Sequence, residues 1–273
     1  MTTLTNDGLF AVAERLGVQT LPVALAVSPQ HDSYDEWRSA QEEAVDGLTA
    51  AGIFDDYGEV TGELAQAMFV LAQPERELVA RIYRTSKDSP DPGVPAEIVR
   101  VCLALRGNDH TIAVRTGDEY DVRPVWSDGS GASLARPLLS ALGACAPAET
   151  ADFTALSQDL SERLDGASTS ADYADACYAL GVADRDATVY GLAFESCYAY
   201  AEIVAYAHED GITTRAPGAV AVYDTRRGRI IALPSIAPDQ RSWSTVTPGT
   251  DHRIAQAISA LVELLPGGRW LRQ

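Results

Sequence analysis

Histidine and cysteine are the side chains that most often act as catalytic bases, nucleophiles or metal ligands, and the chain has four of each. None of the histidines stands in an HExxH or HxH pattern, which disfavours a metal site. The cysteines are far apart and form no CxxC pair, so we expect free, reduced thiols. The residues concerned are His31, His110, His208, His252, Cys102, Cys145, Cys177 and Cys197. We therefore predict no metal ion, and surface or capping positions for the histidines.

Other motifs of catalysis and cofactor binding are also missing from the sequence. Gly129-Ser130-Gly131 lacks the strand and the helix that flank a nucleophile elbow, and no GxxxxGK or GxGxxG loop occurs to bind phosphate. Asp55-Asp56-Tyr57-Gly58-Glu59 resembles half a calcium loop but lacks oxygen ligands at alternating positions, which favours a solvated turn. Folding can still bring two carboxylates together. The sequence thus predicts no catalytic residue and no cofactor, and it favours a binding protein.

The 273 residues carry a formal net charge of −18 at pH 7. Nucleic acid is excluded as a partner because its phosphates would be repelled. A basic partner would be attracted, although a solvated acidic surface is the simpler explanation. The segment from Arg76 to Arg123 is neutral, with eight basic and eight acidic residues. The start, MTTLTNDGLF, shows no export signal, and no apolar run is long enough to cross a bilayer, which predicts a cytoplasmic protein without membrane insertion.

Apolar periodicity predicts three helices before the first long strands. The first runs from about Asn6 to Leu16 with Asn6 as its N-cap, and the others cover Asp35 to Ala50 and Gly62 to Leu71. Four strands follow, and the short turns between the later ones require antiparallel neighbours. They are Leu78 to Thr85, Glu97 to Arg106, His110 to Arg115 and Glu119 to Trp126.

The strand from Glu97 to Arg106 alternates between two kinds of side chain, so its two faces differ. One face is apolar and must be covered by helices; it carries Val99, Val101, Leu103 and Leu105. The other face bears arginines and small residues; it carries Arg100, Cys102, Ala104 and Arg106, with Ala113 and Arg115 of the next strand. Because this second face is neither clearly core nor clearly solvated, it is available to receive a partner.

The second half repeats the order of helices followed by strands. A linker candidate near Asp128 precedes helices at about 134–142, 153–164, 171–180 and 184–194, and then a strand from Tyr198 to Ala207 that carries a row of tyrosines. The chain ends in a hairpin with Asp224 and Gly228 in its turn, and in a helix that is capped by Thr247 or by Thr250-Asp251. Two similar halves that share one sheet are therefore predicted, without a sequence repeat of fixed period.

The C-terminal segment resembles the end of proteins of the EspG family, the cytosolic chaperones of type VII secretion in actinobacteria. The resemblance lies in the hairpin YDTRRGRIIALP and in the capped helix TVTPGTDHRIAQAISALVELLPGG. Two further stretches, LTNDGLFAVAERLGVQTLPVALAV and AGIFDDYGEVTGELAQAMFVLAQPERELVARIY, resemble the start and the first half of such proteins. Residues 146–216 match only in layout.

The resemblance implies a single α+β domain over residues 1–273. Its largely antiparallel central β-sheet would be flanked by N-terminal and C-terminal helical bundles, with pseudo-two-fold halves at about 1–127 and 132–273. The resemblance also implies a cytosolic chaperone and not an enzyme. Such a chaperone would bind PE-PPE-type heterodimers at the exposed tip of the PPE helices and keep them soluble for type VII secretion.

We expect the contact surface on the arginine-bearing face of the sheet, because arginine and tyrosine supply planar contacts and forked hydrogen bonds at binding hot spots. The predicted contact residues are Lys87, Asp88, Arg100, Arg115, Tyr198 and Tyr200. Pairing with local acids inside the sheet is the competing explanation for the same residues. The alternative function is an enzyme or sensor with a small-ligand pocket between the sheet and a helical bundle. The free protein would be a monomer or a homodimer.

Overall fold

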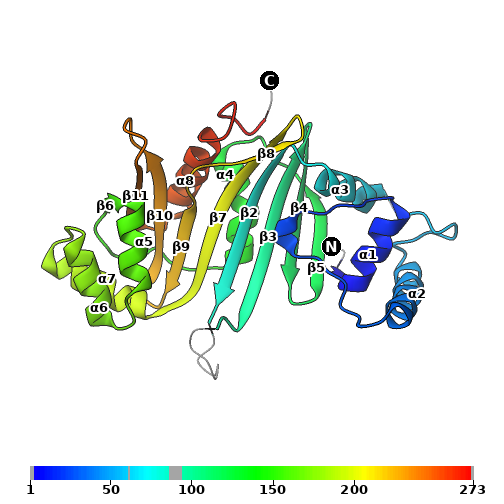
Figure 1. The fold of residues 1–273 in the computed structure, drawn as a ribbon, viewed down its shortest axis with the longest axis horizontal. Helices are drawn as coiled ribbons and strands as arrows, with labels where there is room; N and C mark the ends of the chain where they lie inside the picture. The colour runs from blue at the N-terminus through cyan, green and yellow to red at the C-terminus, as the bar shows by residue number, and fades with distance from the viewer. Residues whose placement is uncertain (1–2, 61, 86–93, 272–273) are drawn as a thin grey trace.

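The computed structural model describes residues 3–60, 62–85 and 94–271. Its centre is one antiparallel sheet of eleven strands in the described residues, in the order β1-β5-β4-β3-β2-β7-β9-β10-β11-β6, with β8 paired to β7 (Figure 1). The strands are β1 Thr3–Thr5, β2 Arg76–Arg84, β3 Glu97–Arg106, β4 Asp109–Thr116, β5 Glu119–Val125, β6 Phe153–Leu156, β7 Cys197–Glu209, β8 Ile212–Arg215, β9 Val220–Thr225, β10 Gly228–Ile236 and β11 Ser242–Pro248. The predicted antiparallel α+β architecture is confirmed.

Eight α-helices and one short 3-10 helix, η1, accompany the sheet in the part of the chain that the structure describes. They are α1 Asn6–Arg15, η1 Val23–Leu25, α2 Tyr34–Ala50, α3 Gly62–Ala72, α4 Gly131–Leu142, α5 Ser157–Asp165, α6 Ser170–Ala179, α7 Asp184–Glu195 and α8 Asp251–Glu263. Each predicted helix is present, with one correction. The helix predicted from Phe153 begins only at Ser157, because Phe153–Leu156 pairs with β11 as the edge strand β6.

The order of elements repeats along the chain. A short strand at one edge of the sheet, helices, four further strands along the main strand order and a final helix occur first as β1 to α4 and then as β6 to α8. The second series also contains β8, which pairs only with β7. The two series meet where β2 pairs antiparallel with β7, from Arg76 opposite Ala207 to Arg84 opposite Ala199. This arrangement explains the predicted pseudo-two-fold halves. We propose that the halves divide after α4, because α4 follows β5 as α8 follows β11.

Helices α4 and α8 cover one face of the sheet, which we call the covered face. The apolar row Val99, Val101, Leu103 and Leu105 packs there with Ile254, Ile258 and Leu261 of α8, as the alternation in the sequence predicts. Gly131 begins α4 where a Cβ atom would lie 2.2 Å from the Ala255 carbonyl oxygen, so only glycine allows the two helices to approach this closely. One core therefore extends beneath both halves.

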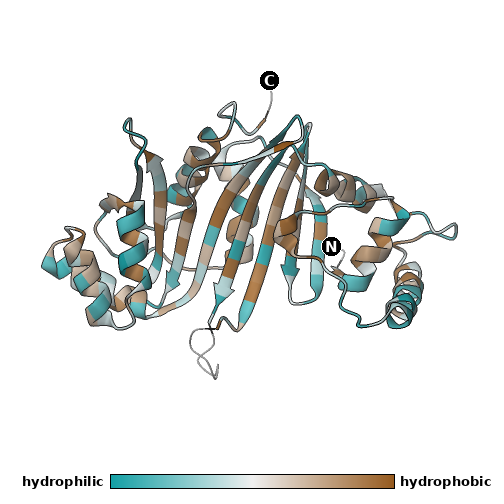
Figure 2. Cartoon of the chain, viewed as in Figure 1, coloured by the Kyte–Doolittle hydropathy of each residue, from teal (hydrophilic) through white to brown (hydrophobic). Residues whose placement is uncertain are grey.

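The opposite face is covered only at its two ends. Helices α1 and α3 with η1 pack over β3, β4 and β5, whereas α5 and α7 pack over β11, β6 and β9. Between these two helical groups, the described α-helices leave the middle strands β2 and β7 uncovered on this face (Figure 1). We call this exposed middle part the open face. Bands of hydrophilic and hydrophobic residues alternate along its strands (Figure 2).

One predicted cap differs in the structure, and a second is decided by it. Thr5, not Asn6, caps α1, since its Oγ1 accepts from the Gly8 N–H at 3.0 Å. Asn6 is buried instead, where its side chain accepts from the Tyr120 hydroxyl at 3.1 Å. Of the two caps predicted for the last helix, Thr250 is the one observed. The segment predicted as a linker near Asp128 precedes α4 and is bonded to its first turn, since Asp128 Oδ1 accepts from the Ser133 hydroxyl at 2.6 Å.

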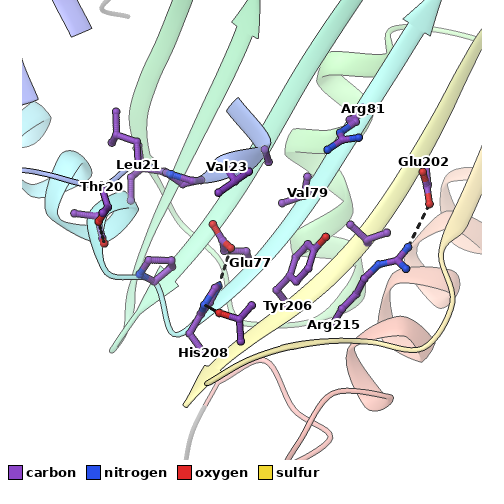
Figure 3. Close-up of a pocket in the computed structure, with 17 residues that line it drawn as sticks. Thr20, Leu21, Val23, Glu77, Val79, Arg81, Glu202, Tyr206, His208 and Arg215 are labelled. Carbon is purple, nitrogen blue, oxygen red and sulfur yellow. Dashed lines mark hydrogen bonds and ion pairs between the residues drawn. The ribbon is translucent and has the colours of Figure 1, made fainter. Parts of the chain in front are cut away.

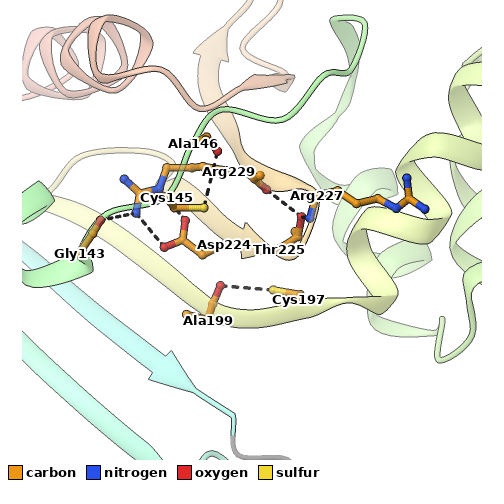
Figure 4. Close-up of polar contacts among 10 residues, drawn as sticks. Gly143, Cys145, Ala146, Cys197, Ala199, Asp224, Thr225, Arg227 and Arg229 are labelled. Atoms are coloured by element: carbon orange, nitrogen blue, oxygen red, sulfur yellow. Dashed lines mark hydrogen bonds and ion pairs between the residues drawn. The ribbon is translucent and has the colours of Figure 1, made fainter.

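Asp224 was predicted as a turn residue and is in fact a strand residue. It lies opposite Arg229 in the β9-β10 ladder and is 2% exposed. Its carboxylate accepts from Arg229 Nε at 2.5 Å and Nη2 at 2.7 Å, and Nη2 also donates to the Gly143 carbonyl at 2.9 Å (Figure 4). Thr225 closes the turn, because its Oγ1 accepts from the Arg227 N–H. The buried ion pair therefore ties the hairpin to the segment that follows α4.

Candidate functional site

The open face carries a row of charged side chains that crosses the middle strands. Arg115, Arg100 and Arg81 are direct neighbours on β4, β3 and β2, and Glu202 of β7 lies opposite Arg81. The Glu202 carboxylate binds Arg215 of β8 at 3.3 Å. Arg81 is exposed and forms no ion pair with any described residue. The open face thus presents an unpaired cation within a strongly acidic protein.

A hollow of about 670 Å³ lies beside Arg81, between the middle strands and η1. Val79 and Val204 form its floor, and Tyr206, Arg215 and Arg81 point into it from β7, β8 and β2 (Figure 3). On its other side the wall is made by residues 20–24 and by the end of α3. The hollow therefore combines an apolar floor with a polar rim, which is the composition of a surface that accepts an amphipathic segment.

At one end of the hollow, three polar side chains form a hydrogen-bonded chain. Glu77 Oε2 lies 2.7 Å from His208 Nε2, and His208 Nδ1 lies 3.0 Å from Thr213 Oγ1. Glu77 is 7% exposed and also accepts from the Cys102 thiol at 3.4 Å. His208 and Thr213 are direct cross-strand partners, so the pairing of β7 with β8 by itself brings their side chains together.

A second hollow of about 530 Å³ adjoins the first along β7, beside helices α5, α6 and α7. Its floor includes Tyr200 and Tyr223, whose ring centroids are 5.1 Å apart, and Tyr83 stacks on the other side of Tyr200 at 6.1 Å. Burial, with a smaller effect of Glu202, raises the pKa of Tyr200 to about 12. The phenol therefore stays protonated at neutral pH, and it can donate a hydrogen bond to a partner.

Arg100 and Arg115 lie side by side, as the sequence predicts, but their surroundings differ. Arg100 is half-buried on the open face. Arg115 is covered by η1 and its side chain is 17% exposed. Its guanidinium donates to the carbonyls of Gly117 at 2.8 Å and Leu25 at 3.0 Å, and to that of Ala26. Because Ala26 has a φ of 49°, Arg115 holds a turn that would otherwise be disfavoured.

Tyr198 does not share the face of Tyr200. The register of β7 shifts between Cys197 and Ala199, and this bulge turns Tyr198 to the other side of the sheet. There its hydroxyl shares a hydrogen bond with the Cys145 thiol, which is the main reason that the pKa of Tyr198 is raised to about 12. Cys145 lies next to the buried Arg229 (Figure 4). The structure therefore separates Tyr198 from the other predicted contact residues.

Lys87 and Asp88 lie outside the described residues. The structure adds Arg81, Tyr83 and Tyr206 to the open face, and the sequence analysis did not include them. The alternation Val79, Arg81, Tyr83 on β2 carries the same signal as β3, and the β2-β3 pairing would have placed Arg81 beside Arg100. The alternation on β2 could therefore have identified Arg81 and Tyr83 from the sequence.

Two further findings concern other kinds of site. Within residues 3–60, 62–85 and 94–271, no group of three or more histidine, cysteine, aspartate or glutamate side chains is placed to hold a metal ion. Every helix in these ranges is too short or too polar to span a bilayer.

Known proteins resemble the chain over almost its whole length. The model of the EspG family matches residues 5–260. The ESX-1 secretion-associated protein EspG1 of Mycobacterium tuberculosis (strain ATCC 25618 / H37Rv) is 30% identical over 269 residues, which cover 98% of this chain and 88% of that protein. The ESX-3 secretion-associated protein EspG3 of Mycolicibacterium smegmatis is 29% identical, with 98% and 88% covered.

A solved structure shows the same fold. It is the type VII secretion system chaperone EspG5 of Mycobacterium tuberculosis in complex with the PE25-PPE41 dimer. The TM-score is 0.78 at 21% sequence identity, and 98% of each chain is covered. Together with the family match, this agreement confirms the resemblance seen in the sequence. The chain belongs to the EspG family.

Proposed function

We propose that this protein is a cytoplasmic chaperone of type VII secretion. It binds a PE-PPE-type heterodimer at the exposed tip of the PPE helices, keeps it soluble until secretion, and catalyses no reaction. The observation that carries this proposal is the match of the whole chain to EspG5, whose solved structure is a complex with a PE-PPE dimer. The open face supplies a surface of suitable chemistry in this chain.

We place the contact on the open face, across both hollows. An apolar helix tip needs an apolar floor with hydrogen-bond donors around it, and Val79, Val204, Tyr200 and Arg81 supply these groups. Among the residues predicted from the sequence, Arg100 and Tyr200 belong to this surface, and Lys87 and Asp88 remain predicted contacts. Arg115 would act indirectly, because it fixes η1 at the wall. Tyr198 lies on the other side.

Two features support the absence of catalysis. Glu77, His208 and Thr213 follow the acid, base and hydroxyl order of a hydrolytic triad, but the cross-strand pairing of β7 with β8 already accounts for their contact. Burial raises the pKa values of Cys177 and Cys197 to about 12, so neither thiol is a thiolate nucleophile at neutral pH. An ester-hydrolysis assay that showed turnover lost in Thr213→Ala would contradict this part of the proposal.

Co-expression with the PE-PPE pair of the same locus, followed by size exclusion, tests the proposal. We expect a stable complex with the unaltered chain. Arg81→Glu should lower the affinity by about 30-fold, since a central interface residue contributes about 2 kcal/mol. Arg136→Glu is the matched control, because Arg136 is exposed on α4 beyond the covered face. Failure of every cognate pair to co-purify would overturn the function, whereas equal affinities of the two variants would overturn only the placement.

A further inference from the structure

Half of the excess negative charge lies in one segment far from the open face. Residues 32–63 contain ten carboxylates and one arginine, a net charge of −9 out of −18. Most of this segment is α2, which stands at the N-terminal end of the molecule beside α1 (Figure 1). Only Gln41 and Leu48 are buried among the 17 residues of α2. Packing within the chain thus uses little of this helix.

A groove of about 720 Å³ runs between α1 and α2 and ends at the turn of residues 54–58. Apolar side chains line it at helical spacing on α2, where Tyr34 is 69% exposed, Trp37 is half-buried and Val45 is 41% exposed. The rings of Tyr34 and Trp37 lie 5.7 Å apart. The groove therefore exposes apolar side chains along about three turns of helix, with Gln41 between Trp37 and Val45.

The rim of the groove is negatively charged. Glu14, Glu42 and Asp46 stand along it. The two cations of the rim have partners within the chain: Arg15 Nη2 donates to the Tyr57 carbonyl at 2.7 Å, and Arg38 Nε donates to Glu42 at 3.2 Å. Neither Glu14 nor Asp46 forms an ion pair with a described residue. The negative charges of Glu14 and Asp46 are therefore not neutralised by cations of the described residues.

Gln41 adds an independent indication that the groove is incomplete. Its side chain lines the groove and is only 8% exposed. The amide nitrogen donates to the Asp7 carbonyl at 3.3 Å, but the amide oxygen Oε1 is buried and accepts no hydrogen bond from a described residue. Buried acceptors without a donor are rare and costly in folded proteins. A donor from a bound partner, met by a small rotation of the amide, would satisfy this oxygen.

We propose that the groove between α1 and α2 binds a cationic amphipathic helix of a partner protein. The apolar side chains of the groove would receive the apolar face of that helix, and lysine or arginine side chains at its edges would meet Glu14 and Asp46 and reach Gln41. Nucleic acid and anionic membrane surfaces are repelled by the same carboxylates. The groove lies outside the open face, so this site is independent of the cargo contact.

Fluorescence anisotropy tests the site with a labelled synthetic peptide of Leu, Lys and Arg, of about 18 residues or five turns, patterned as an amphipathic helix. The reference is a peptide of the same composition with its residues in shuffled order. The test variant is Tyr34→Ala with Asp46→Asn, and the matched control is Tyr178→Ala with Asp175→Asn on α6, which removes the same groups from an exposed helix elsewhere. Thermal midpoints verify that all variants are folded.

We expect the patterned peptide to bind, and to bind about tenfold more weakly to the test variant, while the control stays within about twofold of the unaltered chain. Binding should also weaken as the salt concentration rises above about 0.15 M. Equal binding of the shuffled peptide, or equal losses in test and control variants, would show general attraction to an acidic surface and would overturn the proposal. A homodimer that sedimentation shows to be broken by Tyr34→Ala would also overturn it, since a second copy would then fill the groove.

Discussion

Replacing Asp224 with asparagine removes one charge from the buried pair that joins the β9-β10 hairpin to the segment after α4. Both side chains are almost fully buried, at 3% exposure for Asp224 and 2% for Arg229. Burial alone lowers the pKa of Arg229, but the bonds to Asp224 outweigh this effect and the net pKa is raised. Because a guanidinium is not deprotonated in proteins, Arg229 stays charged in the variant, inside the protein and without its counter-ion.

The expected loss of stability follows from the bonds that change. Asparagine keeps the shape and one acceptor oxygen, so one of the two bonds to Arg229 survives in a weaker, neutral form. A hydrogen bond between charged groups contributes about 1.5–3 kcal/mol and a neutral one about 1 kcal/mol. Losing one and weakening the other costs about 2–5 kcal/mol, and removal of one partner from buried pairs costs about 3–5 kcal/mol. We therefore expect a loss of about 3 kcal/mol.

Urea unfolding followed by circular dichroism measures this loss. With a denaturant dependence of about 3 kcal/mol per M, the midpoint of Asp224→Asn should fall by about 1 M. Asp224→Leu with Arg229→Met removes both charges and should lose less than half as much, because no buried charge remains unpaired. A loss below about 1 kcal/mol in Asp224→Asn, or an equal loss in the double variant, would refute the electrostatic argument.

Three further predictions concern other parts of the chain. Burial lowers the pKa of His110, whose neutral ring accepts from Trp270 Nε1 at 2.9 Å. The free energy of unfolding should therefore fall as the pH drops below about 6.5, by at most about 1.4 kcal/mol per pH unit. Urea unfolding at several pH values should show a smaller fall in His110→Gln. Arg115→Met should release η1, which limited proteolysis would detect as faster cleavage near Leu25 while the helices stay intact; unchanged cleavage would contradict the role given to Arg115. The thiol of Cys177, which is fully buried and has a pKa raised to about 12 by burial, should react with iodoacetamide only on unfolding, and rapid labelling in the folded state would disprove this.

Much of the architecture could be predicted because local patterns agree with the fold. The alternation on β3 places Val101 and Arg100 on opposite faces whatever the rest of the chain does, and the structure confirms both faces. Edge strands are harder to predict. Phe153–Leu156 is a four-residue strand joined directly to a helix, and so short an apolar run is compatible with either element.

The contact surface was less predictable because it depends on pairing between distant strands. The bulge beside Tyr198 has no signature in the sequence, and it moves that side chain away from Tyr200. Asp224 is as suited to a turn as to a strand, and only the buried Arg229 opposite it decides between them. The covering of Arg115 by η1 joins residues about 90 positions apart, which no local pattern reveals.

The pairing of β2 with β7 also sets an order of events during synthesis. In the chain, Ala199 follows its partner Arg84 by 115 positions. At a synthesis rate of about 5–20 residues per second, β7 is synthesised on the order of 10 s after β2, and only then can it pair with the free edge of β2. During that interval the nascent N-terminal half has an unprotected strand edge, which can pair with other chains and aggregate. A chaperone of the proposed kind would therefore pass through an aggregation-prone stage of its own at the ribosome, and slow translation of the second half would prolong it.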